Sequence, residues 1–309
     1  MTYSSPLLQL PDAVDADAPD TGVASHYGNP VAEQRRLEAG TGWVDLSHRD
    51  VVRIAGPDRL TYLHAMTTQF FEGLAPGVPT EALLLSPQGH VEHAFSGVDD
   101  GTAFVASTEP GAGAALVDFL DRMRFMMRVE VGLLSALAVV HRAGRGDVFV
   151  QRSTLAGLPE SDGPPSGMWA YEALRIAAGR ARIGLDTDHR TIPNEIGLPG
   201  VHLDKGCYRG QETVARVHTL GRPPRRLTML HLDGSADRLP ARAATVSAEG
   251  RAVGVMGASA RHHELGPIGL ALVKRNVPVD VTLEVEGIPA GQEPIVDPEV
   301  GLHVRPVLR

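Results

Sequence analysis

The order of apolar and polar positions divides the chain into a mixed first part and a strand-rich last part. From about residue 25 to residue 225, segments with apolar residues at helical spacing alternate with short extended runs. The segment 81–95 is typical of strand, tight turn and strand, because Pro87 presets one φ and Gly89 permits a sharp turn. The other predicted elements are helices over 31–39, from 57 onward, over 110–127 and over 169–179, and strands over 51–56 and 129–140.

Beyond residue 226 the helical spacing disappears. Short extended runs follow one another, separated by Gly, Pro and Asp, without intervening helices. This spacing predicts a small antiparallel β-barrel over residues 226–309, so the expected fold class is α+β with a C-terminal barrel. The runs are 227–232, 244–247, 253–258, 269–273, 281–285 and 294–296.

Residues 1–24 differ from the rest in composition. They carry four aspartates and several alanines and prolines, with no basic stretch followed by an apolar core. We expect a disordered acidic tail and no signal peptide. No run approaches the roughly 18 apolar residues that a membrane span needs, so we expect a soluble, cytoplasmic protein without membrane contact.

Composition narrows the function classes. A chain of 309 residues with 43% hydrophobic content is long enough for two or three cores. A net charge of −8 argues against a general nucleic-acid binder, which would carry a basic surface. The single cysteine excludes an intramolecular disulfide and a four-cysteine iron–sulfur site, and it fits a reducing compartment.

Two histidine pairs are candidates for metal ligands. His90 and His93 are three residues apart, which in a strand places them on opposite faces. His262 and His263 likewise face apart if their segment is extended. Isolated pairs rarely complete a metal shell, so we predict no metal site built by this chain alone.

The sequence KGCYRGQE at residues 205–212 is the strongest candidate for chemistry. It places the only cysteine, Cys207, between two glycines and two residues from Lys205, one of only two lysines among 29 basic residues. A thiol beside a cation can have a lowered pKa, and the thiolate is the reactive form. The alternative is a buried, inert thiol, because free cysteine is often buried.

The same eight residues resemble the K-G-C-[YF]-x-G-Q-E signature of the YgfZ family, folate-binding proteins related to the T-protein (aminomethyltransferase) of the glycine cleavage system. All fixed positions of the signature match. The resemblance implies a tetrahydrofolate-dependent role in assembling or repairing iron–sulfur proteins, with Cys207 and Lys205 in the functional motif. The other matching residues of the motif are Gly206, Tyr208, Gly210, Gln211 and Glu212.

The resemblance extends beyond this motif. The order helix, Gly-x-x-Asp-Leu-Ser, strand, Gly-Pro-Asp, helix after His26 is similar to the N-terminus of the T-protein superfamily. It implies two interleaved α+β subdomains that form a folate-binding region over residues 25–225, followed by the barrel over 226–309. The implied partners are tetrahydrofolate and, among proteins, iron–sulfur clients or assembly factors. We expect a monomer.

Three residues are candidate folate contacts under this resemblance. Glu195 lies in a segment similar to the family's proline-x-acid segment, and it could accept the paired N–H donors of a pteridine. Its alternative role is that of a surface-loop glutamate. Arg175 could bind a folate carboxylate or an internal carboxylate. Glu92 occupies the second strand of the 81–95 hairpin, near the place of the catalytic aspartate of the aminomethyltransferases.

Two enzyme hypotheses stand beside the YgfZ-like one. A folate-dependent aminomethyltransferase or demethylase would share the architecture, but Glu92 and His93 stand where its catalytic aspartate is expected. The longer glutamate moves its carboxylate by about one ångström, and such a displacement can cost two orders of magnitude in rate. A thiol hydrolase would use Cys207 with a histidine distant in sequence, such as His64 or His202.

Overall fold

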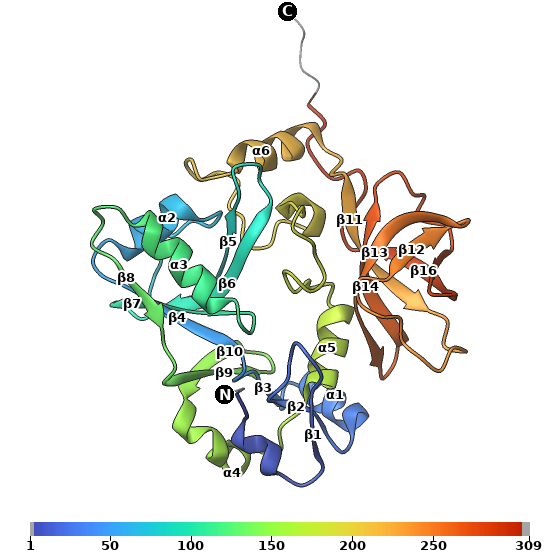
Figure 1. The fold of residues 1–309 in the computed structure, drawn as a ribbon, viewed down its shortest axis with the longest axis horizontal. Helices are drawn as coiled ribbons and strands as arrows, with labels where there is room; N and C mark the ends of the chain where they lie inside the picture. Colours follow the sequence, from blue (N-terminus) through green and yellow to red (C-terminus); the bar gives the residue numbers. More distant parts are fainter. Residues whose placement is uncertain (1–2, 305–309) are drawn as a thin grey trace, which may run out of the picture. The chain divides into compact units, whose positions relative to one another are not determined.

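The computed structural model describes residues 3–304, and its mixed α+β architecture with a closed barrel confirms the predicted fold class. The chain forms two compact units that are interleaved in sequence (Figure 1). The first unit comprises Met1–His64, Phe71–Glu81 and Phe95–Leu174. The second comprises Ala65–Phe70, Ala82–Ala94 and Arg175–Arg309, so the barrel and residues 205–212 belong to one unit.

Helix α1 starts where capping chemistry favours it. The side chain of Asn29 accepts a hydrogen bond from the Ala32 amide at 3.0 Å, and Pro30 occupies the first helical position, where proline is favoured. The helices are α1 Pro30–Glu38, α2 Arg59–Met66, α3 Gly113–Met123, α4 Leu158–Asp162, α5 Met168–Ala177 and α6 Gln211–Leu220, with 3-10 turns η1 Pro6–Gln9, η2 Arg152–Gly157 and η3 Pro193–Ile196.

The strands are β1 Ala13–Asp15, β2 Ala24–Tyr27, β3 Trp43–Asp45, β4 Asp50–Ala55, β5 Thr80–Leu85, β6 Val91–Asp99, β7 Ala103–Thr108, β8 Glu130–Leu133, β9 Leu137–Arg142, β10 Gly146–Gln151, β11 Arg225–Leu232, β12 Thr245–Ala248, β13 Arg251–His262, β14 Gly266–Lys274, β15 Leu283–Val285 and β16 Ile288–Pro294. Three open sheets within residues 3–304 have the strand orders β1-β2, β10-β9-β3 and β5-β6-β7-β4-β8. The remaining strands close into a barrel in the order β11-β14-β13-β12-β15-β16.

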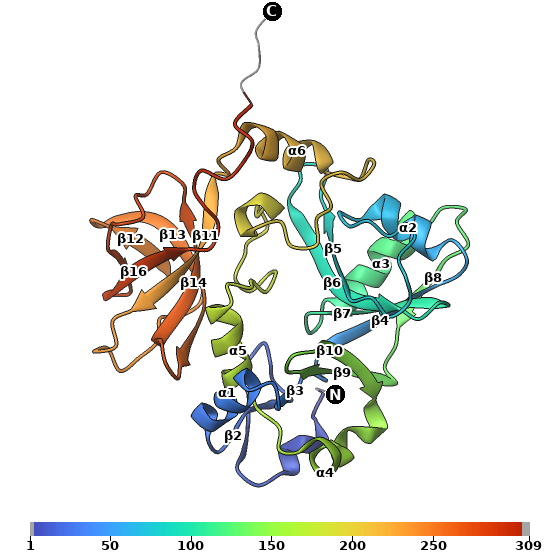
Figure 2. The same ribbon diagram turned by 180° about the vertical axis from the view of Figure 1, so that it is seen from behind.

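In the first unit, α3 packs against the sheet that contains β4 and β8 (Figure 2). Leu116 and Leu120 of this helix are fully buried, which is the pattern of an amphipathic surface helix. A second apolar cluster is built around Val44, Val51 and Val139. These clusters form the core of the first unit.

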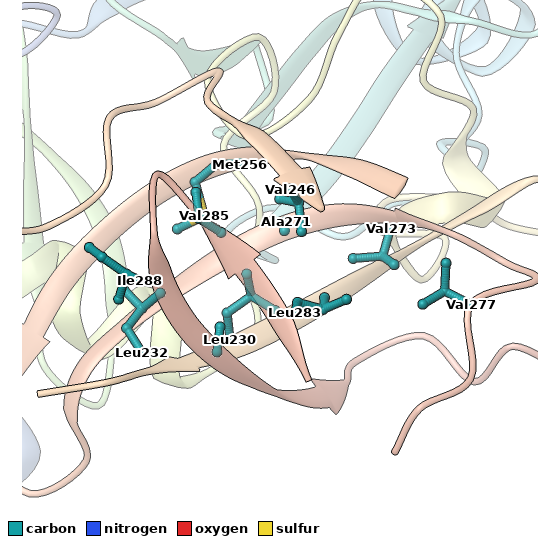
Figure 3. Close-up of a cluster of buried hydrophobic side chains, with 11 residues drawn as sticks. Leu230, Leu232, Val246, Met256, Ala271, Val273, Val277, Leu283, Val285 and Ile288 are labelled. Carbon is teal, nitrogen blue, oxygen red and sulfur yellow. The ribbon is translucent and has the colours of Figure 1, made fainter. Parts of the chain in front are cut away.

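The barrel interior is filled by apolar side chains (Figure 3). Leu230 and Leu232 of β11 pack with Val273 of β14 and Val285 of β15, and none of these side chains is more than 7% exposed. A small barrel filled in this way is a packed core and leaves no channel. It supplies a rigid support for the segments that precede β11.

Residues 3–24 are folded, which corrects the expectation of a disordered acidic tail; residues 1–2 lie outside the described part of the chain. β1 pairs with β2, and Leu7 is 1% exposed within an apolar cluster. Asp20 accepts a bond from His48 at 2.9 Å, and the hydroxyl of Ser5 donates to Asp45 at 2.5 Å. Because these partners lie 28 and 40 residues away, composition alone made the segment look solvated.

The helix expected over 110–127 ends at Met123, and its apolar end does not join a core. Phe125 and Met126 are 81% and 97% exposed. The φ of Phe125 is +46°, which is incompatible with a continuing right-handed helix. The two strands expected over 129–140 form as β8 and β9, but they do not pair with each other and belong to different sheets.

Replacing Leu7 with alanine tests whether the N-terminal segment is part of the core. We expect Leu7→Ala to lower the free energy of unfolding by about 2–4 kcal/mol, because it removes buried methyl groups packed near Trp43. The matched control is Val14→Ala. This variant should change the free energy of unfolding by less than about 0.5 kcal/mol, because Val14 is 47% exposed. Denaturant titration measures both variants. A Leu7→Ala protein as stable as the wild type would show that the segment does not pack in solution.

Candidate functional site

Residues 205–210 of the KGCYRGQE motif form a loop, and its last two residues begin α6. Gly210 is the residue before the helix and has a φ of +79°, a conformation that favours glycine. The Cys207 side chain is exposed. Of the two alternatives for this thiol, the structure therefore selects the accessible one.

Lys205 points away from solvent. Its side chain is buried, and its Nζ donates to the backbone carbonyls of Thr67 at 2.6 Å and Gln69 at 2.9 Å. The ammonium also lies 5.1 Å from the centre of the Tyr208 ring, within the range of a cation–π contact. Carbonyl dipoles and an aromatic face thus compensate the loss of water around this charge.

The segment Ala65–Phe70 is fastened to the residues that precede the motif. Thr68 donates its hydroxyl to the Gly200 carbonyl at 2.6 Å, and its own carbonyl accepts from the His202 amide at 2.9 Å. The same hydroxyl accepts from the Leu83 amide of β5 at 3.0 Å. Thr68 therefore joins the motif loop, this segment and the hairpin of β5 and β6.

The turn between β5 and β6 packs on the start of α6. A Cβ at Gly210 would lie 2.4 Å from the carbonyl oxygen of Ser86, which leaves no room for a side chain. Thr213 of α6 donates to the Gln88 carbonyl at 2.8 Å. Side chains of β5, β6, the motif and α6 also share one apolar cluster. It contains Leu83, Leu85, Val91, Tyr208 and Val214.

Two further charged residues of the motif face solvent. Arg209 donates to Glu92 of β6 at 3.1 Å, and both side chains are about one-third exposed. Glu212 is exposed in the first turn of α6, where a negative charge interacts favourably with the helix dipole. Next to Glu92, burial lowers the pKa of His93, so this imidazole is neutral near pH 7.

Glu195 is 1% exposed, so its alternative role as a surface-loop glutamate is wrong. Arg225 of β11 grips the carboxylate with Nε and Nη2, each 2.8 Å from one oxygen, in a bidentate geometry. Arg225 also donates to Asp188 at 2.6 Å and holds the pKa of that carboxyl well below its usual range. The only local signal for Arg225 in the sequence is its place in a proline- and arginine-rich stretch, which does not reveal its partners.

Arg175 binds an internal carboxylate, one of its two predicted alternatives. The guanidinium is 2% exposed and donates to Asp186 at 2.7 Å. Asp186 also accepts from the Ala258 amide of β13 at 2.7 Å. Arg175, in the last turn of α5, is therefore linked through Asp186 to the barrel, within the second unit.

The structure places four of the histidines singled out in the sequence. His202 packs its ring against Phe70, with centroids 5.3 Å apart, and His64 belongs to the first unit. Among residues 3–304, no hydrogen bond reaches the sulfur of Cys207, so the pairing that a thiol hydrolase requires is not formed. His262 and His263 were expected to face apart, but their rings stack 4.9 Å from each other because His263 follows the end of β13.

The two glycines beside Cys207 provide a matched test of the loop. We expect Gly210→Ala to lower the free energy of unfolding by about 1–3 kcal/mol, because of its positive φ and the Ser86 carbonyl. Gly206→Ala should change it by less than about 0.5 kcal/mol, because a Cβ there meets no atom within 4 Å. Thermal and denaturant unfolding measure both. Equal losses would contradict the packing described for the start of α6.

No family model matches this chain. A chloroplastic protein of Arabidopsis thaliana with a provisional transferase name is 25% identical over 344 residues, covering 89% of this chain and 78% of the relative. An aminomethyltransferase of a Thermotoga species is 24% identical over 316 residues, covering 84% of this chain and 85% of the relative.

Within residues 3–304, none of the helices combines the length and the apolar character that crossing a membrane requires.

Among solved structures, the glycine cleavage system aminomethyltransferase T of Bartonella henselae matches with a TM-score of 0.78. The match covers 94% of this chain and 96% of that chain at 18% sequence identity. The chain therefore has the fold of aminomethyltransferase T, and its relatives in sequence are named as aminomethyltransferases and as a transferase.

Proposed function

We propose that this chain is a YgfZ-like, tetrahydrofolate-binding protein that assists the assembly or repair of iron–sulfur proteins, with Cys207 as its reactive group. The observation that carries the proposal is the exposed Cys207 on a loop whose neighbours Lys205 and Tyr208 are buried. A thiolate is both a nucleophile and a soft ligand for iron. One cysteine supplies a single ligand, so a client or assembly protein must provide the others.

We place a reduced folate beside Asn194 and Glu195, where the buried Glu195 carboxylate would have to give up its Arg225 contact to accept from the ligand. A pteridine presents amino and ring N–H donors along one edge, and these require acceptors. Asn194 is 5% exposed, and its Oδ1 is a buried acceptor without a hydrogen-bond partner in the structure. Its amide nitrogen donates to the Val214 carbonyl at 3.3 Å, which fixes the direction of the amide. Glu195 and Asn194 would hold the pteridine, which supplies a one-carbon carrier when bound.

The other candidate contacts take supporting parts in this proposal. Glu92 stays paired with Arg209 beside the cysteine loop, and Arg175 stabilises the chain between α5 and the barrel. A cytoplasmic, monomeric state also belongs to the proposal, because a lone exposed thiol is best kept reduced in that compartment.

A folate-dependent aminomethyltransferase or demethylase is the second candidate. The relatives named aminomethyltransferases and the TM-score of 0.78 favour it. The position where those enzymes are expected to carry an aspartate holds Glu92, which is paired with Arg209, and the neutral His93. A proton acceptor there would have to be His93, whose half-buried imidazole is deprotonated near pH 7.

Titration calorimetry with tetrahydrofolate tests the ligand. We expect saturable binding that Glu195→Gln weakens by about 10- to 100-fold, because a hydrogen bond to a charged group contributes roughly 1.5–3 kcal/mol. Glu92→Gln should weaken it by less than about threefold, since Glu92 is partly exposed and paired with Arg209. Melting temperatures of both variants control for the lost Arg225 contact. Absence of saturable binding at millimolar ligand, or equal losses in both variants, would contradict the proposed placement.

Cells that lack this chain separate the two candidate functions. If Cys207 serves iron–sulfur proteins, wild-type protein should restore the activity of four-iron enzymes and Cys207→Ser should not, although both bind tetrahydrofolate equally. An aminomethyltransferase would behave differently: Cys207→Ser would complement, and the purified protein, given tetrahydrofolate and an aminomethyl donor, would form methylenetetrahydrofolate and ammonia in a manner that depends on His93. The second pattern would replace the first proposal.

A further inference from the structure

The placement of Lys205 explains why Cys207 faces solvent. Lys205 and Tyr208 flank the cysteine, and both side chains turn inward, the first toward the carbonyls of Thr67 and Gln69 and the second into the apolar cluster with Leu85. With the chain anchored on both sides of the short segment 206–207, the thiol between them is left outside. The exposure of Cys207 is thus imposed by its neighbours.

The two acceptors of Lys205 belong to one short segment. Thr67 and Gln69 flank Thr68, whose hydroxyl and carbonyl are already bonded to Gly200 and His202. The loop before the motif is therefore hydrogen-bonded to the segment Ala65–Phe70 at Thr68. Lys205 donates to the same segment at the residues on either side of Thr68. All of these contacts lie within the second unit.

An ammonium group suits this position better than a guanidinium. An ammonium is a compact charge with three donors, whereas the planar guanidinium carries five, and each buried donor without an acceptor costs free energy. This chain uses arginine for nearly all of its cations, yet it has a lysine here. Its other lysine, Lys274, is exposed and donates to the Ala252 carbonyl at 2.9 Å.

We propose that Lys205 is a positioning residue, a tethered internal cation that locks the Cys207 loop onto the segment Ala65–Phe70. Its ammonium does for this segment what a bound ammonium ion would do in a cage of carbonyls and an aromatic face. The inference rests on the proposed function only in treating Cys207 as the reactive group. Lys205 acts by holding the loop, and Cys207 performs the chemistry.

Chemical rescue of Lys205→Ala tests this role, because a small amine can enter the space that the side chain leaves. Hydrogen–deuterium exchange at the Thr68 and His202 amides should become at least about tenfold faster in the variant, since two hydrogen bonds from a charged donor are lost. Methylammonium should restore slow exchange. Tetramethylammonium at equal ionic strength should not, because it has no N–H donor. Lys274→Ala, the matched control, should exchange like the wild type.

Two further variants keep the test decisive if Lys205→Ala is poorly folded. Lys205→Met fills the same volume without a charge, so exchange should be fast and methylammonium should not slow it. Lys205→Arg keeps the positive charge but places it on a planar guanidinium. Exchange at the Thr68 and His202 amides should therefore also be faster than in the wild type. In each protein, circular dichroism verifies the fold, and exchange in β11–β16 should stay at the wild-type rate.

Three results would overturn the proposal: unchanged exchange at Thr68 and His202 in Lys205→Ala, equal effects of methylammonium and tetramethylammonium, or wild-type exchange in Lys205→Met. None of these measurements contains folate or iron. A failure of the proposed function would therefore leave the test of Lys205 intact. A failure of the Lys205 proposal would likewise leave tetrahydrofolate binding to be judged by calorimetry.

Discussion

The buried ammonium of Lys205 is the contact on which the arrangement of the motif depends. Removing a charge from water is costly unless polar groups replace the water, and the carbonyls of Thr67 and Gln69 with the Tyr208 ring do so here. Because these groups come from separate stretches of the chain, the charge is satisfied only when the stretches are assembled. The same assembly leaves Cys207 accessible.

The eight-residue signature thus combines two kinds of requirement. Lys205, Tyr208 and Gly210 are needed for packing, since they are buried or held in a backbone conformation that favours glycine. Cys207 is exposed, and Arg209 lies near the surface, paired with Glu92. A sequence pattern cannot separate these roles, because it shows which residues are present but not whether each one packs inward or faces solvent.

Local chemistry made much of the fold predictable from sequence. The hairpin of β5 and β6 and the barrel strands follow from turn residues and alternation, which act over a few positions. α6 was missed because it starts after Gly210 in a left-handed conformation, without a side-chain cap to mark its first turn. The N-terminal segment was misjudged because the partners of Asp20 and Ser5 lie far along the chain.

The candidate site was predictable only in part for the same reason. Cys207 and Lys205 were found from their rarity and their pattern, but the inward direction of Lys205 depends on Thr67, 138 residues away. Glu195 was proposed for its segment, whereas its pairing with Arg225 spans 30 residues and required the barrel to be placed. Sequence reasoning thus named the candidate residues and left their internal partners undetermined.

A crystal structure of the protein with tetrahydrofolate tests the central claim most directly, because it reports the ligand, the motif loop and the thiol together. The account predicts a pteridine hydrogen-bonded to Glu195 and Asn194, the two carbonyl bonds of Lys205 intact, and Cys207 accessible to solvent. A folate bound away from Glu195 and Asn194, or a Lys205 side chain released from Thr67 and Gln69 in the complex, would contradict it.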